Sequence, residues 1–266
     1  MSPDESFAGI ADSSRPNAGR IYDYLLGGSH NFEIDRQAAQ QLLQVAPEMP
    51  QWFRLIRWFL GEAVRRLLDK GFTHFVDFAS GLPTIDHIHQ IAPKGTKVIY
   101  SDIDPVTVAY AQELIKGEEN VLCVQCDAAE PEKLLNSPEF KRLFAGETRA
   151  AIGFNGICWF LPDEKLAHSL SVLYEWASPG SRLFLSDIDL KAVSEATRET
   201  FEFYKNVGQP VFPRNVDTLK KLAGKWKLEQ PGFLPLEQWV GLGKEAISEG
   251  KQRMGGGDMV GAILKK

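Results

Sequence analysis

The sequence predicts an α/β fold in which helices precede a mostly parallel sheet. From about residue 73, apolar strand-like runs alternate with helical patterns, which is typical of successive βαβ units. The residues before that point show helical periodicity only. The stretch 75–84 combines a buried strand, a tight turn of small residues and the start of a helix, an arrangement that places a ligand cleft at the carboxyl end of a strand. We therefore expect one main α/β domain with its site at that edge of the sheet.

The N-terminal part of the chain predicts a tail and a helical lid. Residues 1–14 are polar and small and have no periodicity, as expected for a loose tail. Residues 15–71 contain three helical patterns bounded by proline or glycine, and we expect them to cover the mouth of the cleft in the main domain, residues 72–266. The helices are predicted with Pro16 in the first turn and as far as Gly27-Gly28, from Glu33 to Val45, and at about 50–71.

In the main domain, the alternation predicts five strands, each followed by a helix. The strands are expected at 73–78, 97–101, 120–125, 149–154 and 181–187, and the helices near 85–92, 105–116, 132–143, 163–177 and 190–206. Two further strands, at about 226–230 and 258–264, are separated by a long, glycine-rich connection. A long connection of this kind suits an antiparallel final strand.

Composition and charge exclude several classes of protein. With 266 residues, a net charge of -5 and a pI near 5.6, the chain has no basic excess for binding nucleic acid phosphates. No apolar run suits a membrane span and the N-terminus does not resemble a secretory leader, so we expect a cytoplasmic protein with a small-molecule partner, neither nucleic acid nor membrane. Cys123 and Cys126 lie within one predicted strand and point to opposite faces, so no metal site is expected. The oligomeric state is left open.

Three aspartates stand at the predicted ends of three successive strands. Asp77 precedes the small residues Ala79-Ser80-Gly81, Asp102 ends the second strand and Asp127 follows the third. Carboxylates there can accept hydrogen bonds from ribose hydroxyls and reach an adenine edge, whereas three of them would repel a pyrophosphate. The pattern favours S-adenosylmethionine, whose sulfonium is positively charged. The alternative for each aspartate is that it caps the helix that follows. A nicotinamide cofactor is disfavoured because the G-x-G-x-x-G pattern is absent.

The runs around these aspartates, at 76–81, 100–105 and 125–128, resemble the cofactor-binding series of class I S-adenosylmethionine-dependent methyltransferases. More specifically, the chain resembles a bacterial family known as S-adenosyl methyltransferase, formerly a domain of unknown function. The most specific part is Arg-Ile-Tyr-Asp-Tyr-Leu-Leu-Gly-Gly at 20–28, with Asn31-Phe32, Asp35-Arg36, Gly-Leu-Pro-Thr at 81–84 and Trp-Phe-Leu-Pro-Asp at 159–163.

The resemblance implies a Rossmann-like, seven-stranded, mostly parallel sheet with an antiparallel last strand, and S-adenosyl-L-methionine across the strand ends. The cofactor residues that it implies are Asp77 with Ala79, Ser80 and Gly81 at the methionine part, Asp102 at the ribose, Ile103 at the adenine face, Asp127 and Ala128 at the adenine edge, and Asn155 facing both cofactor and substrate.

The chain departs from these families at three positions. Glycine is common in the class where Ala79 and Pro83 stand, and the narrower family usually has histidine where Trp159 stands. An aromatic wall against the substrate is therefore the expected role of Trp159, with a plain core residue as the alternative.

The lid supplies the remaining candidates. If the methyl acceptor must lose a proton, Tyr22, Tyr24, His30 or Asp35 could accept it, although each could equally hold the lid together. A carboxylate of the cofactor or the acceptor could be bound by Arg20, Arg36 or Arg57. The leading hypothesis is a methyltransferase that acts on a small molecule. A cofactor-binding sensor without catalysis and a nicotinamide-dependent oxidoreductase are the alternatives.

Overall fold

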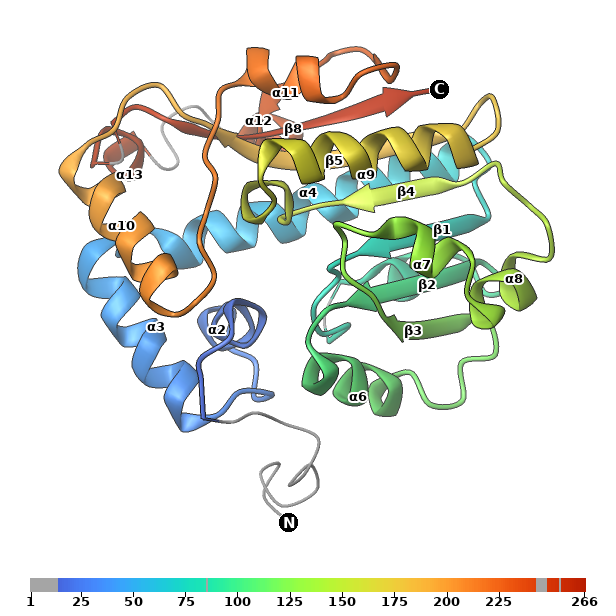
Figure 1. Ribbon diagram of the computed structural model, residues 1–266, viewed down its shortest axis with the longest axis horizontal. Helices are drawn as coiled ribbons and strands as arrows, with labels where there is room; N and C mark the ends of the chain where they lie inside the picture. Colours follow the sequence, from blue (N-terminus) through green and yellow to red (C-terminus); the bar gives the residue numbers. More distant parts are fainter. Residues whose placement is uncertain (1–13, 85, 243–247, 254) are drawn as a thin grey trace.

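The computed structural model describes residues 14–84, 86–242, 248–253 and 255–266. A single eight-stranded sheet has the order β3-β2-β1-β4-β5-β8-β6, with β7 paired to β8, and helices cover both of its faces (Figure 1). The strands are β1 (His74–Phe78), β2 (Lys97–Asp102), β3 (Val121–Gln125), β4 (Ala151–Phe154), β5 (Arg182–Asp189), β6 (Lys227–Leu228), β7 (Leu234–Pro235) and β8 (Asp258–Lys265).

The parallel sheet and its antiparallel last strand confirm the predicted fold class. Strands β1 to β5 pair in parallel, and β8 runs antiparallel to β5 over eight residue pairs, from Arg182↔Lys265 to Asp189↔Asp258. The eighth strand arises because β7, which was not predicted, pairs through Leu234 and Pro235 beside β8. Its two residues include a proline, so the segment has no strand pattern that a sequence could reveal.

The helices follow the prediction in the first two thirds of the chain. They are α2 (Ala18–Leu25), α3 (Glu33–Val45), α4 (Met49–Asp69), α5 (Ile88–Ile91), α6 (Pro105–Leu114), α7 (Pro131–Leu135), α8 (Pro138–Phe144), α9 (Asp163–Trp176), α10 (Glu195–Asn206), α11 (Val216–Leu222), α12 (Leu236–Trp239) and α13 (Ser248–Arg253), with a short 3-10 helix, η1 (Cys158–Phe160).

Local capping explains most of the differences. The first helix begins after Asn17, whose side chain caps it, so Pro16 lies outside the helix. The single helix expected at 132–143 is divided into α7 and α8, because Ser137 caps a new helix that begins at Pro138. The helix expected from 190 begins only at Glu195, where Ser194 accepts a hydrogen bond from Thr197 N. Helices α11, α12 and α13 were not predicted.

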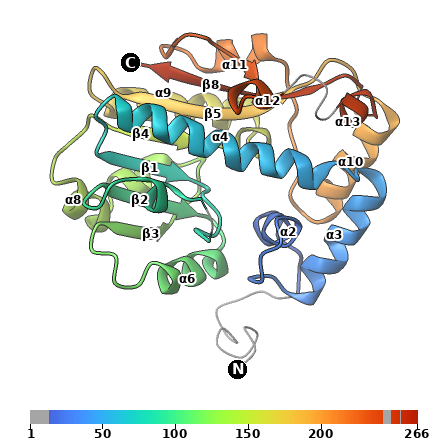
Figure 2. The same cartoon turned by 180° about the vertical axis from the view of Figure 1, so that it is seen from behind.

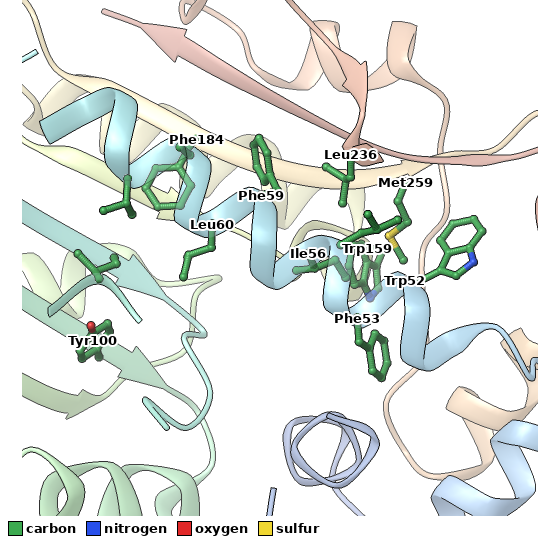
Figure 3. Close-up of a cluster of buried hydrophobic side chains, with 14 of the residues drawn as sticks. Trp52, Phe53, Ile56, Phe59, Leu60, Tyr100, Trp159, Phe184, Leu236 and Met259 are labelled. Atoms are coloured by element: carbon green, nitrogen blue, oxygen red, sulfur yellow. The ribbon is translucent and has the colours of Figure 1, made fainter. Parts of the chain in front are cut away.

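Helix α4 connects the N-terminal helices to the sheet. Figure 2 shows it running across one face of the sheet toward α3, while α7, α8 and α9 lie on the opposite face, which Figure 1 shows in front. Side chains of α4 belong to the same buried cluster as Phe184 of β5, Leu236 of α12 and Met259 of β8 (Figure 3). The segment predicted as a lid is therefore anchored to the main domain by a continuous apolar core.

Buried polar contacts fix the position of α2. Asp35 is fully buried and accepts hydrogen bonds from Arg20 Nε at 2.8 Å, Asn17 N at 2.9 Å and Phe32 N at 2.9 Å. Arg20 also pairs with Asp104, after β2, at 3.1 Å. This arginine thus links the N-terminal helices to the strand that carries Asp102.

The turn after α2 depends on Asp23 and Gly28. Asp23 is buried and accepts hydrogen bonds from His30 N and Asn31 Nδ2, both at 2.9 Å. A Cβ on Gly28 would lie 2.1 Å from Asp23 Oδ1, so only glycine fits there. The Asp and Gly of the Tyr-Asp-Tyr-Leu-Leu-Gly-Gly run are therefore explained by packing.

Within the described ranges, every helix falls short of the length and hydropathy that a membrane span requires. The predicted N-terminal tail, at 1–14, lies outside the described residues except for its last position.

Candidate active site

A cavity of about 400 Å³ lies at the carboxyl ends of the parallel strands. Loops after β1, β2, β3 and β4 form its floor, and α2, α4 and the connection after α10 form its cover. Its lining includes most of the residues that the sequence indicated: Tyr22, Arg57, Asp77, Ala79, Ser80, Gly81, Asp102, Ile103, Asp127, Asn155 and Trp159.

The loop after β1 brings its backbone close to the cavity. Ala79 has a φ of 52° and Gly81 a φ of 65°, so two left-handed residues form the turn. Ser80 between them donates its N–H to Ser101 O at 2.9 Å, which joins the loop to β2. At Ala79 a non-glycine residue adopts the left-handed conformation, so the departure from glycine changes the side chain but keeps the turn.

Asp102 and Asp127 each hold a loop and also face the cavity. Asp102 Oδ2 accepts from Gly81 N at 3.1 Å and its Oδ1 accepts from Asp104 N at 3.0 Å. Burial raises the pKa of Asp102 to about 6. Asp127 Oδ1 accepts from Ala129 N at 2.8 Å. The cap of α6 is Asp104 and not Asp102, so helix capping does not explain Asp102.

Asp77 of β1 and Arg57 of α4 place opposite charges on the wall of the cavity. Asp77 is 2% exposed, and its Oδ1 accepts no hydrogen bond from the part of the chain that the structure describes. Burial raises the pKa of Asp77 to about 7, although the positive charge of Arg57 acts in the opposite direction. Arg57 lies over the ring of Tyr22, 5.5 Å from its centroid, and forms a short contact with His87 Nε2. A carboxylate and a guanidinium together suit a zwitterion that carries an ammonium and a carboxylate.

Apart from Asp127, the residues on the adenine side of the predicted site are apolar. Ile103 lines the cavity and is 54% exposed, so its apolar side chain is accessible to a ligand. Ala128 is buried and its carbonyl accepts from Ser169 Oγ at 2.8 Å, whereas the next residue, Ala129, lines the cavity. The sequence therefore indicated the correct turn, but the residue of that turn that lines the cavity is Ala129 and not the predicted Ala128.

The opposite half of the cavity lies beyond the ends of β4 and β5. Asn155 is locked in place, because its Nδ2 donates to Ile56 O at 3.1 Å and its Oδ1 accepts from Ser186 Oγ at 2.7 Å. Trp159 is 5% exposed, so it serves both as a core residue and as a wall of the cavity.

Tyr204 and Gln209 also line this half, and sequence reasoning missed both. Gln209 Oε1 accepts a short hydrogen bond from Ala18 N, which closes the cover between α2 and the segment after α10. Both residues lie outside any recognisable motif, so no signal in the sequence could have identified them.

Five other candidates lie away from this cavity. Arg20 and Asp35 form the buried link described above, and Arg36 pairs with Glu33 at the surface at 2.9 Å. Tyr24 packs against the apolar core. His30 lines a neighbouring cavity of about 340 Å³, whose wall also includes Arg57.

These residues fit S-adenosylmethionine. Asp77, whose Oδ1 has no partner among the described residues, lies at β1, where the methionine part is expected. Asp102 lies at β2, where the ribose is expected. Ile103 and Asp127 follow β2 and β3, where the adenine is expected, so the three parts follow the strand order. The fit depends on donors and acceptors of this chain and on the open space above Gly81, where an added Cβ would meet nothing within 4 Å.

Comparisons with known proteins agree with this fit. A model of the family described as S-adenosyl methyltransferase matches residues 5–262. A crystal structure of a candidate methyltransferase from Thermobifida fusca YX is 26% identical, with a TM-score of 0.87 and coverage of 97% of each chain. A DUF574 family protein from Streptomyces avermitilis is 24% identical, with a TM-score of 0.83 over 96% of this chain and 99% of that one.

A more distant match shares the fold alone. Geranyl diphosphate C-methyltransferase from Streptomyces coelicolor A3(2), solved with Mg²⁺, geranyl diphosphate and S-adenosyl-L-homocysteine, is 10% identical, with a TM-score of 0.51 over 76% of this chain and 78% of that one. A search of curated protein sequences found no match.

Proposed function

The chain belongs to the S-adenosyl methyltransferase family, and on that premise we propose that it transfers the methyl group of S-adenosyl-L-methionine to a small-molecule acceptor held beside Trp159 and Tyr204. Members of this family are enzymes and use this cofactor, so the nicotinamide-dependent alternative is set aside and catalysis is favoured over a sensor without activity. The proposal names the class of the acceptor, a small molecule, and not the individual compound.

Each end of the cofactor would have its own partners. Asp77 would hold the ammonium of the methionine part and Arg57 its carboxylate, because these are the two opposite charges on this part of the wall. Asp102 would accept hydrogen bonds from the ribose hydroxyls, and Ile103 would cover the adenine face.

The strand order supports the position of the acceptor. The sheet runs β3-β2-β1-β4-β5, so adenine at β3 and methionine at β1 leave the β4 and β5 side for a second molecule. That side is walled by Asn155, Trp159, Tyr204 and Gln209, and this is the observation that carries the proposal. The contact between Ala18 and Gln209 covers it, and a cavity of about 400 Å³ is within the range of roughly 300–1,000 Å³ typical of small-molecule sites.

When bound, S-adenosylmethionine supplies a methyl carbon that accepts the acceptor's lone pair while the carbon–sulfur bond breaks and its electrons stay on sulfur. The protein's part is to align the acceptor and to exclude water. Burial raises the pKa of Tyr22 and of Tyr204 above that of an ordinary phenol, so both stay protonated and serve as hydrogen-bond donors. No histidine is found among the described residues that line this cavity. We therefore favour an acceptor atom that is nucleophilic without help from a general base.

The proposal can be tested with labelled cofactor. The enzyme would be incubated with methyl-labelled S-adenosylmethionine and separate small-molecule, protein and nucleic acid fractions of a bacterial extract. We expect label in the small-molecule fraction with the wild type and, at a cofactor concentration near the wild-type Kd, much less with Arg57→Met. Label in protein or nucleic acid would contradict the proposed acceptor class. A cytoplasmic location and the absence of nucleic acid and membrane partners remain predictions that belong to the same proposal.

A further inference from the structure

A second, smaller cavity of about 40 Å³ lies directly behind the acceptor side of the site. The two cavities share three wall residues, Phe53, Trp159 and Tyr204. The other walls come from the start of α4, the end of β5, α10 and β8, and they are mostly apolar. Figure 3 shows Trp52, Trp159 and Met259, all of which line it, beside the first turns of α4.

Two side chains that line this cavity, those of Glu48 and Trp52, each carry a buried polar atom without a hydrogen-bond partner among the described residues. Trp52 is 4% exposed and Glu48 is 8% exposed, and neither Trp52 Nε1 nor Glu48 Oε1 forms a hydrogen bond with any described residue. The other carboxylate oxygen of Glu48 lies 3.7 Å from Arg253 Nε. Glu48 and Trp52 are four residues apart at the start of α4, so their side chains lie on one face of the helix. Leaving such groups unpaired is unfavourable, so a ligand group is expected there.

We propose that this cavity, lined by Glu48, Trp52, Thr200 and Met259 among others, binds an apolar arm of the methyl acceptor that ends in a hydroxyl group. The inference rests on the proposed function, because the arm would extend from an acceptor held beside Trp159. A hydroxyl fits because it accepts from Trp52 Nε1–H and donates to Glu48 Oε1. An ammonium could not accept from Trp52, and a carboxylate could not donate to Glu48.

The size of the cavity limits the arm. A volume of about 40 Å³ holds about three water-sized groups, since one such group needs roughly 10–15 Å³. The arm is therefore short, and since the hydroxyl takes one of these places, binding should be best for about two or three carbon atoms.

The experiment uses simple alcohols as probes, because they carry both features of the arm. Protein labelled at the methionine methyl groups would be titrated with the 1-alkanols from methanol to hexanol, with and without S-adenosylhomocysteine, and followed by NMR. Met49 and Met259 both line the cavity and report on its occupation. We expect their signals to shift saturably, with the tightest binding at ethanol or propanol. No shift with any alkanol, in the presence or absence of S-adenosylhomocysteine, would overturn the proposal.

A matched pair of variants and one further variant sharpen the test. Thr200→Phe fills the cavity from α10 without touching the main one, and should weaken alkanol binding by at least about tenfold. Glu199→Phe, on the exposed side of the same helix, should leave it unchanged. Equal binding to both variants would contradict the inference.

Trp52→Phe retains the packing but removes the donor, so alkanols should bind about three- to tenfold more weakly. Binding of 1-chlorobutane, which has no hydroxyl, should not change. A wild type that binds 1-chlorobutane as tightly as butanol would overturn the hydroxyl assignment, and this readout does not depend on Thr200→Phe folding well.

The same samples separate the inference from the proposed function. S-adenosylhomocysteine affinity is measured on each protein, and it should be the same in Thr200→Phe as in the wild type. If S-adenosylhomocysteine binds and alkanols do not, the subsite alone is wrong. If alkanols bind and S-adenosylhomocysteine does not, the methyltransferase proposal fails and the cavity remains a binding site.

Discussion

Gly81 donates its backbone N–H to Asp102 Oδ2 across 3.1 Å, which ties the left-handed turn after β1 to the carboxylate that ends β2. In the proposed binding mode, one side chain thus holds the loop beside the methionine part and offers its remaining hydrogen-bonding capacity to the ribose. The other oxygen of Asp102 accepts from Asp104 N, so the carboxylate is oriented before any ligand arrives. Such prior orientation lowers the entropic cost of binding.

Replacing Asp102 should therefore weaken cofactor binding. We expect Asp102→Ala to lose about 1.5–3 kcal/mol of binding free energy toward S-adenosylhomocysteine, as is usual for hydrogen bonds to a charged group. Calorimetric titration measures the loss. The analogue without ribose hydroxyls separates ribose contacts from loop effects, because wild type and variant should bind it with nearly equal affinity. If the variant loses as much affinity for that analogue as for the natural ligand, Asp102 acts only through the loop.

Arg57 should bind the carboxylate of the cofactor. It is the arginine that lines the cavity among the three indicated by the sequence, since Arg20 and Arg36 are engaged elsewhere. Arg57→Met is expected to lower S-adenosylhomocysteine affinity by about 1.5–3 kcal/mol, and Arg57→Lys by less, because lysine keeps the charge but not the bidentate geometry. Arg65→Met, exposed on the same helix, is the control and should bind normally. Unchanged affinity in Arg57→Met would remove this residue from the site.

Asp77 should link stability and binding to pH in opposite directions. Burial raises its pKa from 3.8 to about 7, so the folded protein holds this proton more tightly than the unfolded chain. The resulting stability is fully present below about pH 3.8 and is lost as the pH rises through about 7. Asp77→Asn should therefore stabilise the ligand-free protein at about pH 8, by up to about 4 kcal/mol if the full shift of roughly three pKa units applies at about 1.4 kcal/mol each.

Cofactor binding should show the reverse trend. The ammonium needs the ionised carboxylate, so wild-type affinity for S-adenosylhomocysteine should rise as the pH passes through about 7, with a smaller rise near 6 from Asp102. In Asp77→Asn the rise near 7 should disappear and the affinity should be low throughout. Thermal unfolding and calorimetry at several pH values measure both effects. A variant that is less stable than the wild type at about pH 8, or a wild-type affinity that does not depend on pH, would contradict this assignment.

The parallel part of the fold could be predicted because its signals are local. Strands β1 to β5 are apolar runs such as Phe75-Val76, and each ends at a turn that polar or small residues mark in the sequence. The aspartates at their ends needed only the rule that parallel strands place their carboxyl ends at one edge. The cofactor half of the cavity follows from these two facts.

The acceptor half could not be predicted because it depends on long-range contacts. Gln209 contacts Ala18, which is 191 positions earlier in the chain. Tyr204 is a buried residue of the amphipathic helix α10, and its position on the apolar face gives no sign that it also lines a cavity. The lid motif was also ambiguous in the sequence. Tyr22 and Asp35 both belong to the N-terminal residues that carry the family resemblance, yet only the structure shows that one lines the cavity and the other is fully enclosed.

Two ion pairs on α3 should differ sharply in their contribution to stability. Asp35 is 0% exposed and holds Arg20, whose charge is buried with it, whereas Glu33 pairs with Arg36 in solvent. Removing Asp35 leaves the buried charge of Arg20 with Asp104 alone and takes the acceptor from two backbone N–H groups, so Asp35→Ala is expected to lower the free energy of unfolding by about 3–5 kcal/mol. Glu33→Ala is the matched control on the same helix and should unfold like the wild type, because solvent screens that pair. Urea unfolding of the three proteins measures the differences. Since Arg20 also holds Asp104, Asp35→Ala should in addition weaken S-adenosylhomocysteine binding, and a variant that unfolds like Glu33→Ala would show that α2 is held by its apolar contacts alone.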